Sequence, residues 1–202
     1  MLLTPFELRS VGERSMGLSP GSLTWTGPFD PASDEDWRAF QAGDIDEREY
    51  WARRCAEFHE LTGEAPEMPV FMSHLYDGDE DEIVRPGAVA LIADAKVAGI
   101  PVGALTNDLT AFHSQDWIDR MKVIREFDQM VDGRRDGVMK PDPAAYRLMA
   151  DRLGVRPEEC VFIDDQPANL AGARAVGMRT VHLDPVDPEP GFAEARQALG
   201  LD

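Results

Sequence analysis

The stretch Cys160-Val161-Phe162-Ile163-Asp164-Asp165 decides the fold, because an apolar run ends there in two adjacent carboxylates. The segment 166–176 that follows begins with a proline turn and becomes rich in alanine, which is typical of a helix. The whole pattern predicts a buried parallel strand, then a turn and a helix. Ligands of open α/β sheets bind outside the carboxyl ends of the strands, so the two acids mark the expected site.

Asp164 and Asp165 also indicate a bound cation. Adjacent carboxylates repel each other unless a proton or a cation lies between them, and burying a charge without a partner is strongly unfavourable. Mg²⁺ is a hard cation that prefers carboxylate oxygens. The pair therefore predicts a magnesium site at this strand end.

Outward from this stretch, helical and strand patterns alternate from residue 83 onward. Such alternation is the signature of a doubly wound parallel sheet. The expected helices are 86–98, 109–121, 143–153 and 168–176, and the expected strands are 100–105, 127–131, 160–163 and 180–183.

The first part of the chain, 1–82, has an acidic and helical pattern. One helix is expected to begin at Ser33 as its cap, and a second to cover 46–61. The aromatic residues of this part are expected to form its own small core: Trp25, Trp37, Phe40 and Trp51. We therefore predict a small helical region, 1–82, and an α/β core, 83–202.

Composition excludes several classes of partner. The chain has 202 residues, 43% hydrophobic residues and a formal net charge of -18. This acidity argues against nucleic acid and anionic membranes, which both require basic patches. The sequence shows neither a membrane span nor a secretory signal. Cys55 and Cys160 are expected to be structural thiols, with a reducing cytoplasm as the location.

Two further polar segments follow or precede predicted elements of the sheet. Thr106 and Asn107 come directly after a buried strand, although such residues often only cap the next helix. Lys140 stands before a proline, ahead of a helix, where it could hold one positive charge at a fixed place. Taken alone, a surface lysine would be the simpler interpretation.

Together, the order and spacing of these segments resemble the haloacid dehalogenase-like hydrolase superfamily. The resemblance covers residues 83–184 and is to phosphatase-type members similar to the amino-terminal domain of soluble epoxide hydrolase. The helical region 1–82 is similar to the cap of that family. The residues that match the second, third and fourth motifs are Thr106 with Asn107, Lys140, and Asp164-Asp165 with Asn169.

The resemblance implies a phosphatase that acts on a small organic phosphate through an aspartyl-phosphate. By it, Asp165 with Asp164 would hold Mg²⁺, and Lys140 would pair with nucleophile and phosphate. The Thr106 hydroxyl and the Asn107 backbone N–H would bind phosphoryl oxygens. The paired acids speak against dehalogenase chemistry, which proceeds without the metal in this superfamily.

The first motif of the superfamily, which carries the aspartate nucleophile, is missing from the sequence. Met1-Leu2-Leu3-Thr4-Pro5 resembles the tail of that motif, with everything before it absent. We therefore expect that the start is misassigned or truncated, so that nucleophile and central strand are lost. A reading frame without an upstream strand ending in Asp-x-Asp or Asp-x-Gly would contradict this expectation.

Two internal segments could substitute for the missing motif. Asp44 and Asp46 lie in a polar turn without a buried strand ahead of them, which argues against them. Asp77 is the stronger rival, because the apolar segment 70–72 precedes it, although its acidic surroundings suit a solvated loop.

An alternative function is a non-catalytic relative that acts as a binding or regulatory module. The retained lysine and acids argue against it, because a module without chemistry has little reason to keep a costly charge cluster. A core without its central strand would expose two strand edges, which predicts possible self-association.

Overall fold

The structure is a computed structural model that describes residues 1–201. These residues divide into two compact units. Unit 2 is Leu2–Val84, and unit 1 contains Met1 together with the chain from Arg85 onward. Among the described residues, no helix combines the length and the apolar character needed to cross a bilayer.

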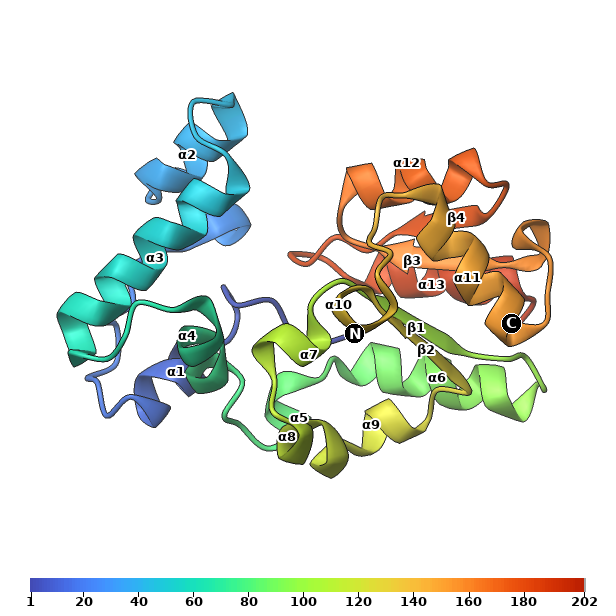
Figure 1. Cartoon of the computed structure of the whole chain (residues 1–202), viewed down its shortest axis with the longest axis horizontal. Coiled ribbons are helices and arrows are strands. Elements are labelled where there is room, and N and C mark those ends of the chain that lie inside the picture. Colours follow the sequence, from blue (N-terminus) through green and yellow to red (C-terminus); the bar gives the residue numbers. More distant parts are fainter. Residues whose placement is uncertain (202) are drawn as a thin grey trace. The chain divides into compact units, whose positions relative to one another are not determined.

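Unit 2 is helical (Figure 1). A short antiparallel bridge joins Leu2 to Val84, where the unit begins and ends. Its helices are α1 (Arg9–Ser15), η1 (Gly27–Phe29), α2 (Glu35–Ala42), α3 (Glu47–Thr62), α4 (Met68–Leu75) and α5 (Glu80–Ile83).

Aromatic rings form the core of unit 2. The Phe6 ring lies 5.5 Å from Trp25, 5.1 Å from Trp37 and 5.5 Å from Trp51, measured between ring centroids. Trp25 and Tyr50 are almost completely buried. Edge-to-face aromatic pairs stabilise a core beyond the area that they bury. The expected packing role of the tryptophans is confirmed.

Asp34 organises the start of α2, where the sequence suggested Ser33 as the cap. The Asp34 carboxylate accepts hydrogen bonds from the N–H groups of Thr26, Gly27 and Trp37. It also accepts one from the Tyr50 hydroxyl at 2.9 Å, and the residue is only 3% exposed. The bonds from Thr26 and Tyr50 join residues 8 and 16 positions apart, so the local sequence could not predict them.

These bonds make the stability of unit 2 depend on pH. Burial alone would raise the pKa of Asp34, but the hydrogen bonds outweigh it and lower the pKa. Its contribution is therefore complete above the unfolded pKa of about 3.9, and it is lost as the pH falls through the folded pKa. We expect Asp34→Ala to lower the free energy of unfolding at pH 7 by about 2–4 kcal/mol, as measured by urea denaturation.

A matched control is Asp30→Ala, because Asp30 is an exposed acid of the same loop. This control should stay within about 0.5 kcal/mol of the unmodified chain. Equal unfolding curves for the two variants at pH 7 would show that the Asp34 bonds contribute nothing.

Unit 1 alternates helices and strands. Its helices are α6 (Pro86–Val97), α7 (Leu109–Phe112), α8 (Gln115–Arg120), α9 (Lys122–Arg125), α10 (Gly133–Asp136), α11 (Pro143–Leu153), η2 (Pro157–Glu159), α12 (Pro167–Ala175) and α13 (Glu189–Leu199). Its strands are β1 (Gly103–Thr106), β2 (Gln129–Asp132), β3 (Val161–Asp164) and β4 (Arg179–His182).

The strands form two parallel ladders. β1 pairs with β2 so that Thr106 lies opposite Asp132, and β3 pairs with β4 so that Asp164 lies opposite His182. The predicted alternation of helices and parallel strands is confirmed. The predicted single doubly wound sheet is not what the described residues form, because β1 and β3 belong to separate two-stranded sheets.

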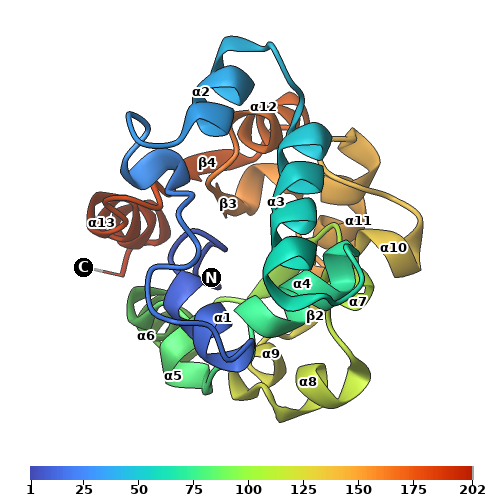
Figure 2. The ribbon, with the colours of Figure 1, turned by 90° about the vertical axis from the view of Figure 1, so that its left-hand side faces the viewer.

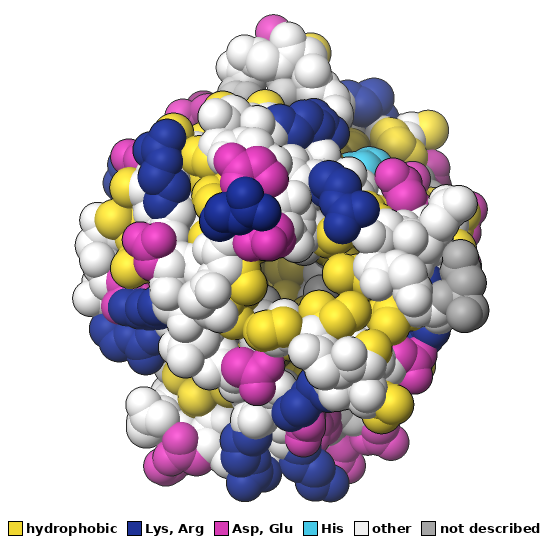
Figure 3. Space-filling model, turned by 90° about the vertical axis from the view of Figure 1, so that its right-hand side faces the viewer, with side chains coloured by type: hydrophobic (Ala, Val, Ile, Leu, Met, Phe, Trp, Pro, Cys, Tyr) yellow, Lys and Arg dark blue, Asp and Glu magenta, His cyan; other side chains and the backbone are white. Residues whose placement is uncertain are grey.

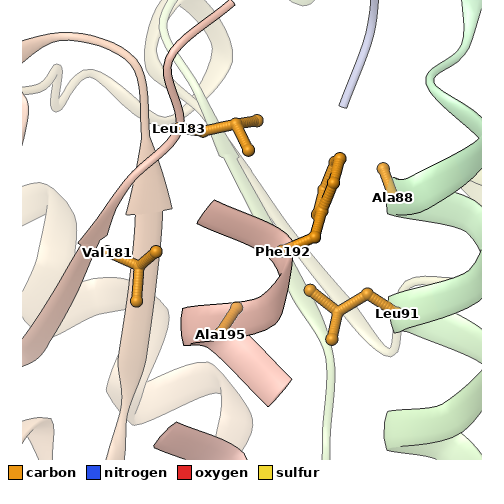
Figure 4. Close-up of a cluster of buried hydrophobic side chains, with 6 residues drawn as sticks. All are labelled: Ala88, Leu91, Val181, Leu183, Phe192 and Ala195. Atoms are coloured by element: carbon orange, nitrogen blue, oxygen red, sulfur yellow. The ribbon is translucent and has the colours of Figure 1, made fainter. Parts of the chain in front are cut away.

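Helices cover the ladders from opposite sides. On one side, α6 and α13 lie next to each other (Figure 2). Their side chains pack with β4 in a cluster of Ala88, Leu91, Val181, Leu183, Phe192 and Ala195 (Figure 4). On the other side, Tyr146 of α11 packs edge-to-face on Phe162 of β3, with ring centroids 5.2 Å apart.

One predicted helix, 109–121, is wrong as a single element. The chain leaves the helix after Phe112 and starts again as α8. The cause is Ser114, whose hydroxyl accepts a hydrogen bond from the Trp117 N–H at 3.2 Å and caps the second helix. The other predicted elements of unit 1 occur, with ends shifted by a few residues.

Candidate active site

Asp164 is the most constrained of the predicted site residues. It ends β3, and the residue is 9% exposed. One carboxylate oxygen, Oδ1, accepts bonds from the Gln166 N–H and the Asn169 side-chain amide, both at 2.9 Å. The other, Oδ2, pairs with Lys140 Nζ at 2.7 Å. The sequence matched Asn169 to this motif, and the structure shows it bound to this carboxylate.

Lys140 is held from both ends. The Asn107 side chain brackets its backbone, because Oδ1 accepts from the Lys140 N–H at 2.8 Å and Nδ2 donates to its carbonyl at 3.1 Å. The ammonium is fixed by Asp164 and lies 5.8 Å from the centre of the Phe162 ring. Asn107 therefore ties the end of β1 to Lys140, a side-chain role that the sequence did not reveal.

Asp165 differs from its neighbour in its surroundings. Its side chain is exposed, whereas Asp164 is buried. The pKa of Asp165 is raised, first because nearby protein atoms displace water from one side and second because of the Asp164 charge. Its backbone carbonyl lies 3.2 Å from His182 Nε2. The negative charge of the Asp165 carboxylate is thus only partly neutralised by the groups around it.

Thr106 ends β1 beside the residue that brackets Lys140. Among the described residues, no hydrogen bond of its hydroxyl is found. The hydroxyl is therefore available to an external oxygen.

Asp132 was missed by the sequence analysis. It ends β2 and is 0% exposed. Its carboxylate accepts hydrogen bonds from the N–H groups of Thr110, Arg134 and Arg135 and so fixes the starts of two helices. The signal was present, because an acid directly after an apolar strand is the pattern that singled out Asp164.

The amino end of the chain lies in the same region. The pKa of the Met1 ammonium is lowered to about 6, first by burial and then by Arg85. The charges of Asp165 and Asp164 act in the opposite direction, and Lys140 lowers it further. The Met1 carbonyl accepts a hydrogen bond from the Arg85 N–H at 3.0 Å.

The two carboxylates, Asp164 and Asp165, suit a cation that takes few ligands from the protein and keeps most of its bound water. Among residues 1–201, no group of three or more His, Cys, Asp or Glu side chains is arranged to hold a metal. Asp164 has internal donors on both oxygens, whereas the Asp165 carboxylate is exposed beside it. Mg²⁺ commonly binds through one or two carboxylates, waters and substrate phosphates, so these acids fit that ion.

Asp77 belongs to unit 2. Its carboxylate accepts a hydrogen bond from the Ser15 hydroxyl at 2.9 Å. The apolar segment 70–72, considered as a strand ahead of it, lies within α4 instead. Pro69 near the start of that segment suits the first turn of a helix, where its missing N–H costs nothing. Among the described residues, the segment directly ahead of Asp77 is therefore helical and does not place it at a strand end. Asp44 and Asp46 also lie in unit 2, where Asp46 caps α3.

Comparisons with known proteins identify relatives of the chain. The chain is 32% identical over 114 residues to a phosphatase of Mycobacterium tuberculosis, covering 52% of each protein. It is 41% identical over 75 residues to bifunctional epoxide hydrolase 2 of Sus scrofa, covering 37% of this chain and 13% of that protein. The chain thus spans about half or less of these relatives.

Solved structures show the same fold. L-2-haloacid dehalogenase from Xanthobacter autotrophicus superposes with a TM-score of 0.55 at 18% identity, covering 97% of this chain and 77% of that one. The model of the haloacid dehalogenase-like hydrolase family matches residues 29–177, which is well over half of the chain. The chain belongs to the haloacid dehalogenase-like hydrolase family.

Proposed function

We propose that the chain provides most of the active site of a Mg²⁺-dependent phosphatase for a small organic phosphate. The observation that carries this proposal is the ion pair of Lys140 with Asp164, next to the exposed carboxylate of Asp165. A positive charge fixed at the end of a strand can attract a phosphate against the negative field of the whole protein.

Asp165, with Asp164, would hold Mg²⁺. When bound, the ion would neutralise phosphate charge. The internal bonds of Asp164 keep its carboxylate in place, so Asp165 would be the principal ligand.

Lys140 and Thr106 would bind the phosphoryl group. Among residues 1–201, one carboxylate pairs with Lys140 Nζ, which leaves N–H donors of the ammonium for a phosphate oxygen. The Thr106 hydroxyl and the Asn107 backbone N–H would bind further oxygens, as the family resemblance implies. Fixed donors of this kind stabilise the charge that develops during phosphoryl transfer.

We assign the nucleophile to none of the residues that have a role in the proposed site, which are Lys140, Thr106, Asn107, Asp164 and Asp165. Asp77, the internal rival, is engaged by Ser15 in unit 2. We expect the 202 residues to bind a phosphate ester without turning it over. The helical region 1–82 would select the substrate, as caps do in the family.

Binding of p-nitrophenyl phosphate, measured by calorimetry, tests the proposed function. We expect binding that requires Mg²⁺ and is abolished by a chelator. Thr106→Val keeps the shape of the side chain but removes the hydroxyl, so it should weaken binding about tenfold, the loss for a hydrogen bond to a charged group. Thr110→Val is the matched control, because Thr110 is exposed and its side chain is not assigned to the site.

Two results would contradict the proposal. Binding that is equally tight in a chelator would exclude the metal. Release of p-nitrophenol that disappears in Asp77→Asn would make Asp77 the nucleophile.

A further inference from the structure

Tyr146 is a buried residue of α11 to which the proposed function gives no role. It is 0% exposed, and its hydroxyl donates a hydrogen bond to the Asn169 carbonyl at 2.7 Å. Burial, and after it the charge of Asp164, raises the pKa of the hydroxyl to about 12, so the group stays protonated at neutral pH. Tyr146 therefore offers a permanent donor that fixes the backbone in the first turn of α12.

One connection runs from Tyr146 through α12 to the ion pair of the site. The side-chain amide of Asn169 donates to Asp164 Oδ1 at 2.9 Å, and Asp164 Oδ2 pairs with Lys140 Nζ at 2.7 Å. The carbonyl that Tyr146 binds and the amide that binds Asp164 belong to the same residue. The hydroxyl therefore limits where the amide, the carboxylate and the ammonium can lie.

A second connection runs through an aromatic ring of β3. Tyr146 packs edge-to-face on Phe162, with ring centroids 5.2 Å apart. Lys140 Nζ lies 5.8 Å from the centre of the same Phe162 ring. A cation within about 6 Å of an aromatic ring centre can be attracted by the ring. Tyr146 thus supports both the carboxylate and the ring that lie next to the ammonium.

The backbone closes these connections into a ring of contacts. Residues 141–145 join Lys140 to Tyr146, and the Asp142 carboxylate caps α11 by accepting a hydrogen bond from the Ala144 N–H at 2.8 Å. Lys140 is therefore held by its own chain at one end and by groups that Tyr146 fixes at the other. Functional groups supported in this way by surrounding residues keep a precise position.

Gly172 allows α12 to lie close enough for this arrangement. α11 and α12 contact each other and lie next to each other in Figure 1. A Cβ atom at position 172 would lie 2.5 Å from the Pro141 carbonyl oxygen and 2.9 Å from the Tyr146 hydroxyl oxygen. Contacts this short would push α12 away from the loop that carries Lys140. The close approach therefore requires glycine.

The position of Lys140 matters because charges elsewhere on the surface are mixed. Figure 3 shows a face on which Lys and Arg side chains are interspersed with Asp and Glu side chains. Exposed charges of this kind are screened by salt, whereas partly buried pairs are screened much less. The Lys140 side chain is 14% exposed. A phosphate would therefore depend on this one ammonium being in the right place.

We propose that the Tyr146 hydroxyl is a positioning group that, through Asn169 and Asp164, holds the Lys140 ammonium where a phosphoryl oxygen binds. This inference rests on the proposed function. Asp165 is not one of the groups in the ring of contacts, and its carboxylate is exposed. Loss of the hydroxyl should therefore weaken the binding of the phosphate more than the binding of the cation.

Tyr146→Phe tests the inference, because it keeps the aromatic ring and removes only the hydroxyl. In calorimetry with p-nitrophenyl phosphate and saturating Mg²⁺, binding should weaken about tenfold, at the lower end of the effect of residues behind a ligand. Mn²⁺ binding, measured by water-proton relaxation, should change much less. Gly172→Ala disturbs the same contact from α12 and should show the same difference between the two ligands.

Tyr76→Phe is the matched control. The Tyr76 hydroxyl also donates to a backbone carbonyl, that of Leu3 at 2.9 Å, but it belongs to unit 2. This variant should leave the affinities for p-nitrophenyl phosphate and Mn²⁺ unchanged.

Proton exchange of the Asn169 side-chain amide gives a readout that needs neither Mg²⁺ nor phosphate. By nuclear magnetic resonance, this exchange should be faster in Tyr146→Phe and unchanged in Tyr76→Phe, because only the first variant loosens Asn169. Unchanged exchange in Tyr146→Phe would overturn the inference. Unchanged binding of p-nitrophenyl phosphate, or an equal loss of p-nitrophenyl phosphate and Mn²⁺ binding, would overturn it too. Failure of the unmodified chain to bind the ester would instead overturn the proposed function, and this inference with it.

Discussion

Lys140→Met is expected to lower the free energy of unfolding by about 3 kcal/mol, because it leaves the buried carboxylate of Asp164 without its cation. The Lys140 and Asp164 side chains are 14% and 6% exposed, so water can replace the lost partner only poorly. The value is at the lower end for a broken buried pair because Gln166 and Asn169 still donate to Asp164. Urea denaturation at neutral pH measures the change.

A double-mutant cycle separates the pair from the loss of packing. Lys122→Met makes the same chemical change at an exposed lysine and should stay within about 0.5 kcal/mol of the unmodified chain. Asp164→Asn in the Lys140→Met background should recover at least about 1 kcal/mol, because it removes the unpaired charge. Strictly additive effects would mean that the two side chains do not interact.

The strand-end logic predicted most of the charged site. An apolar run that ends in acids gave β3, Asp164 and Asp165, and the proline after Lys140 marked the loop that leads into α11. These features are local, because the pattern of neighbouring residues predicts both burial and turns. The same logic, applied to Asp132, would have found the buried acid at the end of β2.

Other features depend on contacts between residues remote in the sequence. Asn107 reaches Lys140 across 33 positions, so its bracket could not be predicted from either segment alone. The choice of Asp34 over Ser33 as cap depends on Tyr50, 16 positions away. Periodicity cannot report such partners, because it records only which face of an element is apolar.

The separation of the two ladders does not follow from the strand patterns. Strand patterns alone predicted one sheet, because they say that a segment is extended and not which neighbour it pairs with. The partial exposure of β1 and β3 indicates which strand edges lack a neighbour, and this exposure can be observed only in the folded structure.

Asp165→Asn is expected to weaken Mg²⁺ binding tenfold or more. The change removes the exposed carboxylate but keeps the shape of the side chain, and even residues behind a metal ligand typically contribute about 10–100-fold to affinity. Asp164 should not compensate, because its oxygens remain engaged by Lys140, Gln166 and Asn169. Asp187→Asn is the matched control, because it removes one exposed acid outside the site.

Water-proton relaxation with Mn²⁺, competed by Mg²⁺, tests the claim that this strand end is a metal-assisted phosphoryl site most directly. We predict saturable Mn²⁺ binding that Mg²⁺ displaces. Asp165→Asn should weaken this binding tenfold or more, and Asp187→Asn should leave it unchanged. Equal affinity in the unmodified chain and Asp165→Asn, or equal loss in both variants, would contradict the account.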